Sequence, residues 1–343
     1  MKVIFSELQK NHYPQHFLSS GAQQDNPEVP ERADRLLQAA LAAGLELLEP
    51  EDAGLEPLAA VHSPEYLQFL QNIYRRWCYI DGASAEVVPN IHPDRRDGAY
   101  PASAVGQAGF HMLDTGCPIS ADTWGSALIS AHTAVQGAAL LLDEEDRGVS
   151  WAYALCRPPG HHAGRDFAAG FCYLNNSAIA AQELLAGFGR VAILDIDVHH
   201  GNGTQDIFYQ RSDVLTVSLH ADPERFYPFF WGHAAERGRG EGLGYNLNIP
   251  LPRGSGDKDY LSQLDKALTR IEAFAPGALV VALGLDAHEL DPFQGLAITT
   301  KGFGKIAERI AALELPTLMV QEGGYLSDEL GTNLESFLQG FQS

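Results

Sequence analysis

Two aspartates and a histidine stand at alternate positions, Asp195, Asp197 and His199, directly after the apolar run Val191-Ala-Ile-Leu194. Alternate side chains of an extended chain project to the same side, so these polar groups are expected to converge. Carboxylate oxygens and an imidazole nitrogen form a ligand set that zinc accepts. The spacing therefore favours a metal site, although a solvated loop can carry the same short pattern.

Three further segments offer groups that a metal hydrolase needs. The loop Cys156-Arg-Pro-Pro-Gly-His-His162 follows the strand-like run Trp151–Leu155 and delivers His161 and His162. Imidazoles titrate near neutral pH, so this pair is a candidate for acid/base work, with a purely structural pair as the alternative. Two more apolar runs end in an acid, Asp286, and in a glycine turn followed by a phenol, Tyr325.

The elements that must position these groups are apolar strands alternating with helices. Such a pattern predicts an α/β fold with a central, mostly parallel, doubly wound sheet, whose ligands bind beyond the carboxyl ends of the strands. Residues 1–5 are expected to form the first strand, and the polar segment 9–30 a surface loop. Pro30 and Pro64 each stand where a helix is expected to start. We expect residues 1–343 to form a single domain.

Two segments are unusual for their position. Residues from about 80 to 124 are rich in Gly, Pro, Asp and Ser and are far longer than a normal connection, which indicates a functional or oligomerising insertion. Residues 226–231 hold five aromatics, which would line an apolar channel, form an interface or simply pack a loop.

Composition narrows the class of protein. The 343 residues are 45% hydrophobic and carry a formal charge of -21, which disfavours nucleic acid and anionic membranes and would attract cations, or merely keep the protein soluble. No unbroken apolar run has the roughly 18 residues that a membrane span needs. The four cysteines show no CxxC spacing and are expected to be reduced, and we expect the protein to be cytoplasmic.

Taken together, four segments resemble the zinc-dependent histone deacetylase superfamily, which has the arginase/deacetylase fold: Arg157-Pro-Pro-Gly-His-His162, Asp195-Ile-Asp-Val-His-His-Gly-Asn-Gly-Thr204, Leu283-Gly-Leu-Asp286 and Glu322-Gly-Gly-Tyr325. Three others are most similar to its bacterial acetylpolyamine amidohydrolases: Met1-Lys-Val-Ile-Phe-Ser-Glu7, Gly106-Gln-x-Gly109 and Ile119-Ser-x-x-Thr-Trp124. The resemblance spans nearly the whole chain.

The resemblance implies two kinds of bound ion. Asp197, His199 and Asp286 would hold one zinc ion per chain and leave positions open for water and the substrate carbonyl. A potassium ion would bind side-chain and main-chain oxygens of a second set, namely Asp195, Asp197, His199, Ser218 and Leu219.

The resemblance also implies the catalytic roles. His162 would take the proton of the attacking water and later give one to the leaving amine, with His161 as its electrostatic partner. Asp195 would orient His161, and Asn202 would hold His162. Tyr325 would donate its hydroxyl hydrogen to the oxyanion.

Substrate contacts follow the same resemblance. Phe171 and Tyr227 would flank the linear methylene chain of the substrate. Arg32 would lie near the acetate exit route, or else be a charge on a helix surface. The chain departs from the family at Val105 and Gly116, where acids that contact the distal ammonium are expected.

The expected activity is hydrolysis of small linear acetylated amines, such as acetylputrescine or acetylcadaverine, to acetate and free amine. Asp94, Asp97 and Asp114 lie near enough in sequence to replace the missing acids. The insertion would shape the substrate tunnel and form a homodimer. Deacetylation of acetyl-lysine peptides or other small acyl amides is the main alternative. A two-manganese ureohydrolase would need further ligands, and a non-catalytic binding module would be expected to have lost a site residue.

Overall fold

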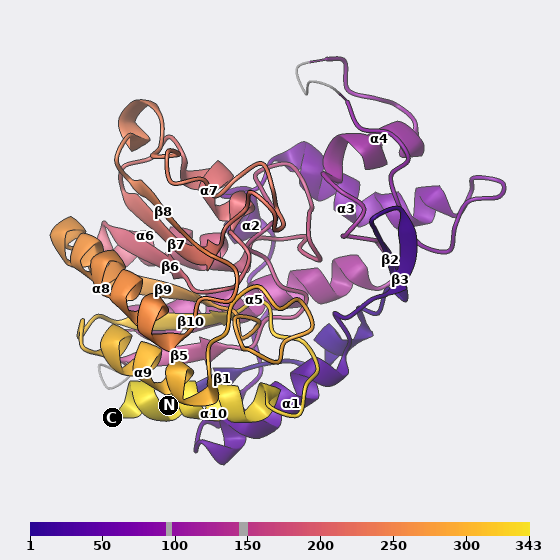
Figure 1. Cartoon of the computed structure of the whole chain (residues 1–343). Helices are drawn as coiled ribbons and strands as arrows, with labels where there is room; N and C mark the ends of the chain where they lie inside the picture. Colours follow the sequence, from indigo (N-terminus) through magenta and orange to yellow (C-terminus); the bar gives the residue numbers. More distant parts are fainter. Residues whose placement is uncertain (94–97, 144–149) are drawn as a thin grey trace.

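The computed structural model describes residues 1–93, 98–143 and 150–343, and in this part of the chain the core is an eight-stranded sheet (Figure 1). The strand order is β4-β1-β5-β10-β9-β6-β7-β8, and all neighbouring strands run parallel. The bounds are β1 Lys2–Ile4, β4 Glu46–Leu48, β5 Trp151–Ala154, β6 Val191–Asp195, β7 Val214–Ala221, β8 Asn246–Leu251, β9 Ala278–Leu283 and β10 Thr317–Gln321. The predicted parallel α/β sheet is confirmed.

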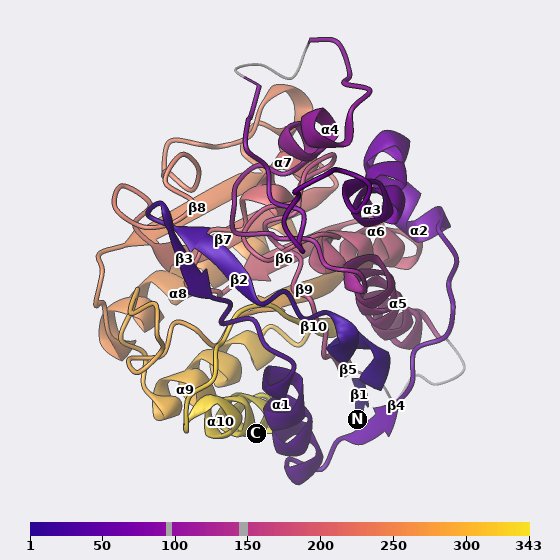
Figure 2. The ribbon, with the colours of Figure 1, turned by 90° about the vertical axis from the view of Figure 1, so that its right-hand side faces the viewer.

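Helices cover both faces of the sheet, as Figure 2 shows. On one face lie α1 (Glu31–Ala42), α8 (Asp257–Phe274), α9 (Thr300–Ala311) and α10 (Leu330–Gln342). On the other lie α2 (Glu56–Ala59), α3 (Pro64–Trp77), α5 (Thr123–Leu142) and α6 (Asn176–Phe188). Within β6, Leu194 packs in the first layer and Ile193 in the second. Burial on both faces explains why these strands are continuously apolar.

Helix α5 is long and apolar enough, by length and composition, to cross a membrane. In this protein 56% of the apolar stretch is buried, and the helix packs against α6 and strands β5 and β10. It therefore occupies the position of a core helix, and its small residues allow this close packing.

The segment 9–30 is not the simple surface loop expected from its polarity. It contains part of a 3-10 helix, η1 (Glu7–Asn11), and an antiparallel hairpin of β2 (His16–Ser19) and β3 (Ala22–Asp25). Ser20 and Gly21 both have positive φ angles, 52° and 77°, as a tight hairpin turn requires. Because the strands are largely exposed, they show no clear apolar alternation that would reveal them in the sequence.

The segment 80–124 projects from the main body (Figure 1) and contains α4 (Ala104–His111). The side chain of Ser103 caps this helix by accepting a hydrogen bond from the Gly106 main-chain nitrogen at 3.1 Å. A bridge between Val87 and Ile119 closes the base of the segment. The helix is short and weakly amphipathic, which explains the lack of periodicity in the sequence.

Candidate active site

Five adjacent strands, β5, β10, β9, β6 and β7, bring the candidate residues to one edge of the sheet. Asp195 ends β6, and the segments after β5, β9 and β10 supply His161, Asp286 and Tyr325. All four side chains are buried. The strand ends therefore converge as the sequence predicts.

Asp197, His199 and Asp286 place their ligand atoms within 4.8 Å of one another. The Nδ1 atom of His199 lies 3.2 Å from Asp197 Oδ1 and 3.3 Å from Asp286 Oδ2. Main-chain amides fix both acids, because Gly323 N–H donates to Asp197 Oδ2 at 2.8 Å and Val198 N–H donates to Asp286 Oδ1 at 2.9 Å. The three side chains are thus held in place by the fold.

The chemistry of this group fits a divalent cation. Among the described residues, Asp286 Oδ2 is buried and accepts no hydrogen bond, and its charged neighbour is His199 Nδ1 at 3.3 Å. Burial and the neighbouring Asp197 carboxylate raise the pKa of Asp286 to about 6. A Cβ atom at position 323 would lie 2.1 Å from Asp286 Oδ2, so glycine keeps this space open. Two buried carboxylates beside an imidazole match the donor set of a catalytic zinc site.

The histidine pair has two different environments. His161 Nδ1 lies 2.9 Å from Asp195 Oδ2, His162 Nδ1 lies 2.7 Å from Asn202 Oδ1, and the ring centroids are 4.0 Å apart. Burial opposes charge on His161, but Asp197 and Asp195 outweigh it and raise the pKa of His161 to about 10. Burial and the His161 charge hold the pKa of His162 well below its usual value.

The two histidines can therefore divide their roles. An amide oxygen only accepts, so His162 uses its Nδ1–H toward Asn202 and keeps Nε2 free as a base. His161 is suited to remain cationic beside it.

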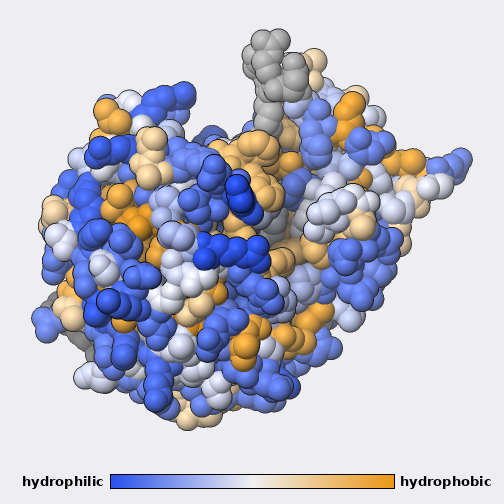
Figure 3. Space-filling view, in the orientation of Figure 1, coloured by the Kyte–Doolittle hydropathy of each residue, from blue (hydrophilic) through white to orange (hydrophobic). Residues whose placement is uncertain are grey.

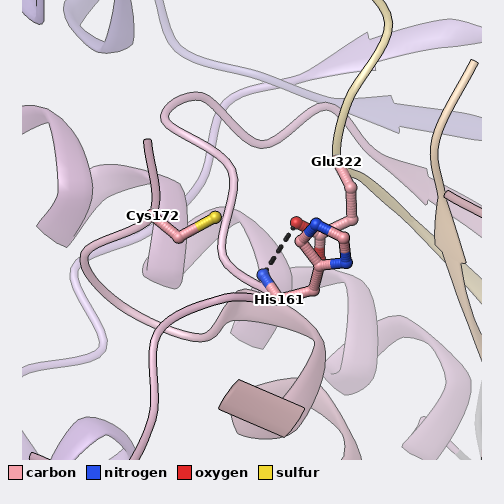
Figure 4. Close-up of side chains that lie close together, drawn as sticks. All are labelled: His161, Cys172 and Glu322. Atoms are coloured by element: carbon pink, nitrogen blue, oxygen red, sulfur yellow. Dashed lines mark hydrogen bonds between the residues drawn. The ribbon is translucent and has the colours of Figure 1, made fainter. Parts of the chain in front are cut away.

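Glu322 is a site residue that sequence reasoning cited only as part of a motif. Its fully buried carboxylate accepts hydrogen bonds from the main-chain N–H groups of Gly160 (2.7 Å) and His161 (3.0 Å), the second of which Figure 4 shows. The other carboxylate oxygen accepts from the Ser177 hydroxyl at 2.7 Å. Glu322 thus connects the end of β10 with the histidine loop and α6.

His161, Cys172 and Glu322 also lie close enough to form a three-ligand group (Figure 4). Their hydrogen bonds argue against a metal there. Both Glu322 oxygens already accept hydrogen bonds, from Gly160 N–H and from the Ser177 hydroxyl, and His161 is hydrogen-bonded to Asp195. Burial raises the pKa of Cys172 well above its usual value, so this thiol stays protonated. All four cysteines are free, as expected.

Arg32 is buried, so the alternative of a helix-surface charge is wrong. Its guanidinium donates to the carbonyl oxygens of Gly324 and Glu322 and pairs with Glu28 Oε1 at 2.6 Å. The same guanidinium lies 5.0 Å from the centre of the Tyr325 ring. Arg32 therefore fixes the glycine turn that carries the phenol.

Tyr325 is 4% exposed and has Phe293 and Phe171 as ring neighbours, at 4.9 and 6.1 Å between centroids. Burial and the Asp286 charge raise the pKa of Tyr325 well above its usual value. The phenol therefore keeps its proton and is available as a hydrogen-bond donor.

Phe171 and Tyr227 both lie beside the site, Phe171 next to Tyr325 and Tyr227 next to the histidines. The Tyr227 ring lies 4.9 Å from the His162 ring and 6.0 Å from that of His199. Phe226, from the same aromatic loop, stacks on His199 at 5.0 Å. Part of this loop thus packs against the site, whereas Phe229 and Phe230 are exposed. The surface beside the projecting segment is hollowed and carries apolar residues (Figure 3).

The remaining predicted residues lie in different places. Ser218 and Asp195 line a cavity of about 10 Å³ beside the site. Val105 lies on α4, and Gly116 lies next to Asp114. The two other candidate acids, Asp94 and Asp97, lie outside the described residues.

The fold and this site define a member of the histone deacetylase family, to which the chain belongs: residues 26–341 match the histone deacetylase domain. Among its relatives are an acetylpolyamine amidohydrolase of Burkholderia pseudomallei, 47% identical over 99% of this chain and 98% of the relative, and acetylpolyamine amidohydrolase 1 of Pseudomonas aeruginosa, 44% identical over 100% and 99%.

A solved structure of a related protein has the same fold. The crystal structure of acetylpolyamine aminohydrolase from Burkholderia pseudomallei superposes with a TM-score of 0.96 at 47% identity, covering 100% of this chain and 99% of that chain. The predicted superfamily, fold and deacetylase-type hydrolase class are therefore confirmed.

Proposed function

We propose that this chain is a zinc-dependent deacetylase that hydrolyses small linear acetylated amines, with acetylputrescine and acetylcadaverine as the expected type of substrate. The observation that carries the proposal is the buried group of Asp197, His199 and Asp286 beside the His161–His162 pair and Tyr325. Support for the substrate comes from the full-length similarity to proteins named acetylpolyamine amidohydrolases.

The three ligands would hold zinc, which would polarise the acetyl carbonyl and acidify a water molecule. His162 Nε2 takes the proton of the attacking water and then delivers a proton to the leaving amine nitrogen. His161, hydrogen-bonded to Asp195, would place positive charge beside His162 and stabilise the developing negative charge. Asn202 keeps the His162 ring in the tautomer that this task requires.

The Tyr325 hydroxyl donates to the oxyanion that forms from the acetyl oxygen. Arg32 holds the turn from which this phenol projects. Phe171 and Tyr227 then enclose the methylene chain, so the acetyl group enters the buried site while the amine end remains toward the opening. A linear substrate suits such an approach.

A bound potassium ion is part of the proposal. The small cavity beside Asp195 and Ser218 has room for a single ion or water, and its lining includes both polar residues and the apolar Ile193 and Val217. Asp195 and Ser218, two of the five residues of the expected potassium set, line this cavity. An ion bound by that set would support the strand end that carries Asp195 and Asp197.

We also propose a cytoplasmic homodimer formed by the segment 80–124. This segment and its neighbourhood expose large apolar side chains, with Tyr79 84% and Ile91 61% accessible. Molar mass by light scattering would test the dimer. We expect the wild type to have the mass of two chains and Ile91→Glu to have the mass of one. A wild-type mass of one chain would contradict the proposal.

The substrate assignment is tested by turnover of acetylputrescine, acetylcadaverine, acetylspermidine and an acetyl-lysine peptide on zinc-loaded protein. We expect the highest kcat/KM for one of the acetylated polyamines. A preference for the peptide would instead favour the alternative, a protein or peptide deacetylase.

A further inference from the structure

Asp114, in the segment 80–124, contacts two other segments that lie beside the site. Its Oδ2 atom accepts a hydrogen bond from the Tyr227 hydroxyl at 2.6 Å. The main-chain N–H of Gly170, the residue before Phe171, donates to the same carboxylate at 3.2 Å. The Gly116 N–H donates to Oδ1 at 2.7 Å. One carboxylate thus joins three segments that are far apart in the sequence.

The contact with Tyr227 determines where that ring lies. A tyrosine ring can turn about two side-chain bonds, and the hydrogen bond at its tip fixes the end farthest from the main chain. The same ring is a neighbour of the His162 and His199 rings. Movement of Tyr227 would therefore change the channel and the surroundings of the histidines together.

The contact with Gly170 acts on the turn that leads into Phe171. Gly170 and Phe171 have φ angles of 47° and 65°, a left-handed pair that is uncommon outside glycine. The carboxylate and the Gly116 carbonyl, which accepts from Phe171 N–H at 2.9 Å, hold this turn. The Phe171 ring is thereby kept against Tyr325 and against Phe17 of the hairpin.

Gly116 leaves space for this arrangement. A Cβ atom at position 116 would lie 3.2 Å from Asp114 Oδ1 and 3.8 Å from the Gly170 Cα atom. A longer side chain there would crowd the carboxylate. The absence of an acid at position 116 is thus compatible with the hydrogen bonds that Asp114 accepts from Tyr227 and Gly170.

We propose that Asp114 is a positioning residue that sets the width of the substrate channel by hydrogen bonds to Tyr227 and Gly170. This inference rests on the proposed deacetylase function. On this proposal, the segment 80–124 affects how the substrate chain is positioned, in addition to any role in dimer formation.

The test compares two substrates of similar length, acetylputrescine, which is cationic, and N-butylacetamide, which is neutral. Asp114→Ala should lower kcat/KM at least about tenfold for both, because a displaced wall misplaces any linear chain. Asp114→Asn should stay within about threefold of wild type, since its amide can accept from N–H groups and donate to the Tyr227 oxygen. Asp122→Asn, an exposed acid of the same segment, is the matched control.

A double-mutant cycle tests the route of the effect. In a Tyr227→Phe background the loss caused by Asp114→Ala should shrink, because part of the contact is already gone. Three results would each overturn the proposal. The first is full additivity of the two losses, and the second is normal kinetics of Asp114→Ala. The third is a loss that both Asp114 variants show only with the cationic substrate.

Failure of the proposed function would be seen in the wild type, as absent turnover of all acetylated amines. Positioning can then be measured without turnover, by ¹³C NMR of labelled tyrosine, with the Tyr227 signal assigned by its loss in Tyr227→Phe. We expect Asp114→Ala to shift that signal and Asp122→Asn to leave it in place. An unshifted signal in Asp114→Ala would contradict the inference.

Discussion

The carboxylate of Glu322 lies 3.0 Å from the main-chain nitrogen of His161 and accepts its hydrogen bond. The same oxygen accepts from Gly160 N–H, so a single buried acid fixes the main chain just before His162. Glu322 does this from the end of β10, the strand that also leads to Tyr325. The histidine pair and the phenol are therefore held by one short segment.

Two substitutions at Glu322 test whether its hydrogen bonds hold the histidine loop. Glu322→Gln can still accept from both N–H groups and donate to the Ser177 oxygen, so its kcat should stay within about tenfold of wild type. Glu322→Ala leaves two buried N–H groups without partners, at about 1–3 kcal/mol each, and should lower both Tm and kcat. Kinetics and thermal unfolding check this, with the exposed Glu308→Ala as control. Equal behaviour of the two Glu322 variants would contradict it.

Tyr325→Phe tests the donor role of the phenol. The ring and its packing remain, whereas the hydroxyl is lost, so kcat should fall at least about a hundredfold. Zinc content, Tm and substrate affinity should stay close to wild type. A near-normal kcat in a folded, zinc-loaded variant would remove Tyr325 from the mechanism.

Arg32→Met should destabilise the protein through the turn before Tyr325. The change removes the Arg32 hydrogen bonds to the Gly324 and Glu322 carbonyls and removes one of the two arginines beside the buried Glu28. Breaking a buried ion pair typically costs about 3–5 kcal/mol, so Tm should fall clearly. Differential scanning calorimetry measures this. Arg35→Met, on the exposed side of the same helix, should leave Tm nearly unchanged, and an equal drop in both variants would count against the assigned contact.

Asp286→Asn tests the ligand assignment with little change of shape. The amide oxygen can replace Oδ1 toward Val198 N–H, but the anionic ligand is gone. Zinc affinity should fall by at least about a hundredfold, more than loss of an outer contact typically causes. Asp197→Ala and His199→Ala should behave likewise, as measured by metal analysis after dialysis. Full zinc occupancy in any of these, with Asp259→Asn as the exposed control, would exclude that residue as a ligand.

The parts of the site that depend on local sequence could be predicted. The apolar run before Asp195 specifies a buried strand, and alternate spacing places Asp197 and His199 together. Resemblance of whole motifs then pointed to Asp286 and Tyr325, which the fold brings to the same edge.

Contacts between distant segments could not be read in the same way. Glu322 and His161 are 161 positions apart, and Asp114 and Tyr227 are 113 apart, so each pair exists because of tertiary packing. Neither acid is marked by spacing or periodicity. The polar hairpin of β2 and β3 was missed for a related reason, since exposed strands lack an apolar face.

We propose that Asp197, His199 and Asp286 would hold the zinc ion that this chain needs to hydrolyse the acetyl amide. The most direct test is to strip the protein of metal, titrate it with zinc and follow acetate release from acetylputrescine by NMR. We expect no release without metal and a rate that rises with zinc up to about one equivalent per chain, as a single three-ligand site requires. Acetate release from the metal-free protein, or none from the fully zinc-loaded protein, would contradict the account.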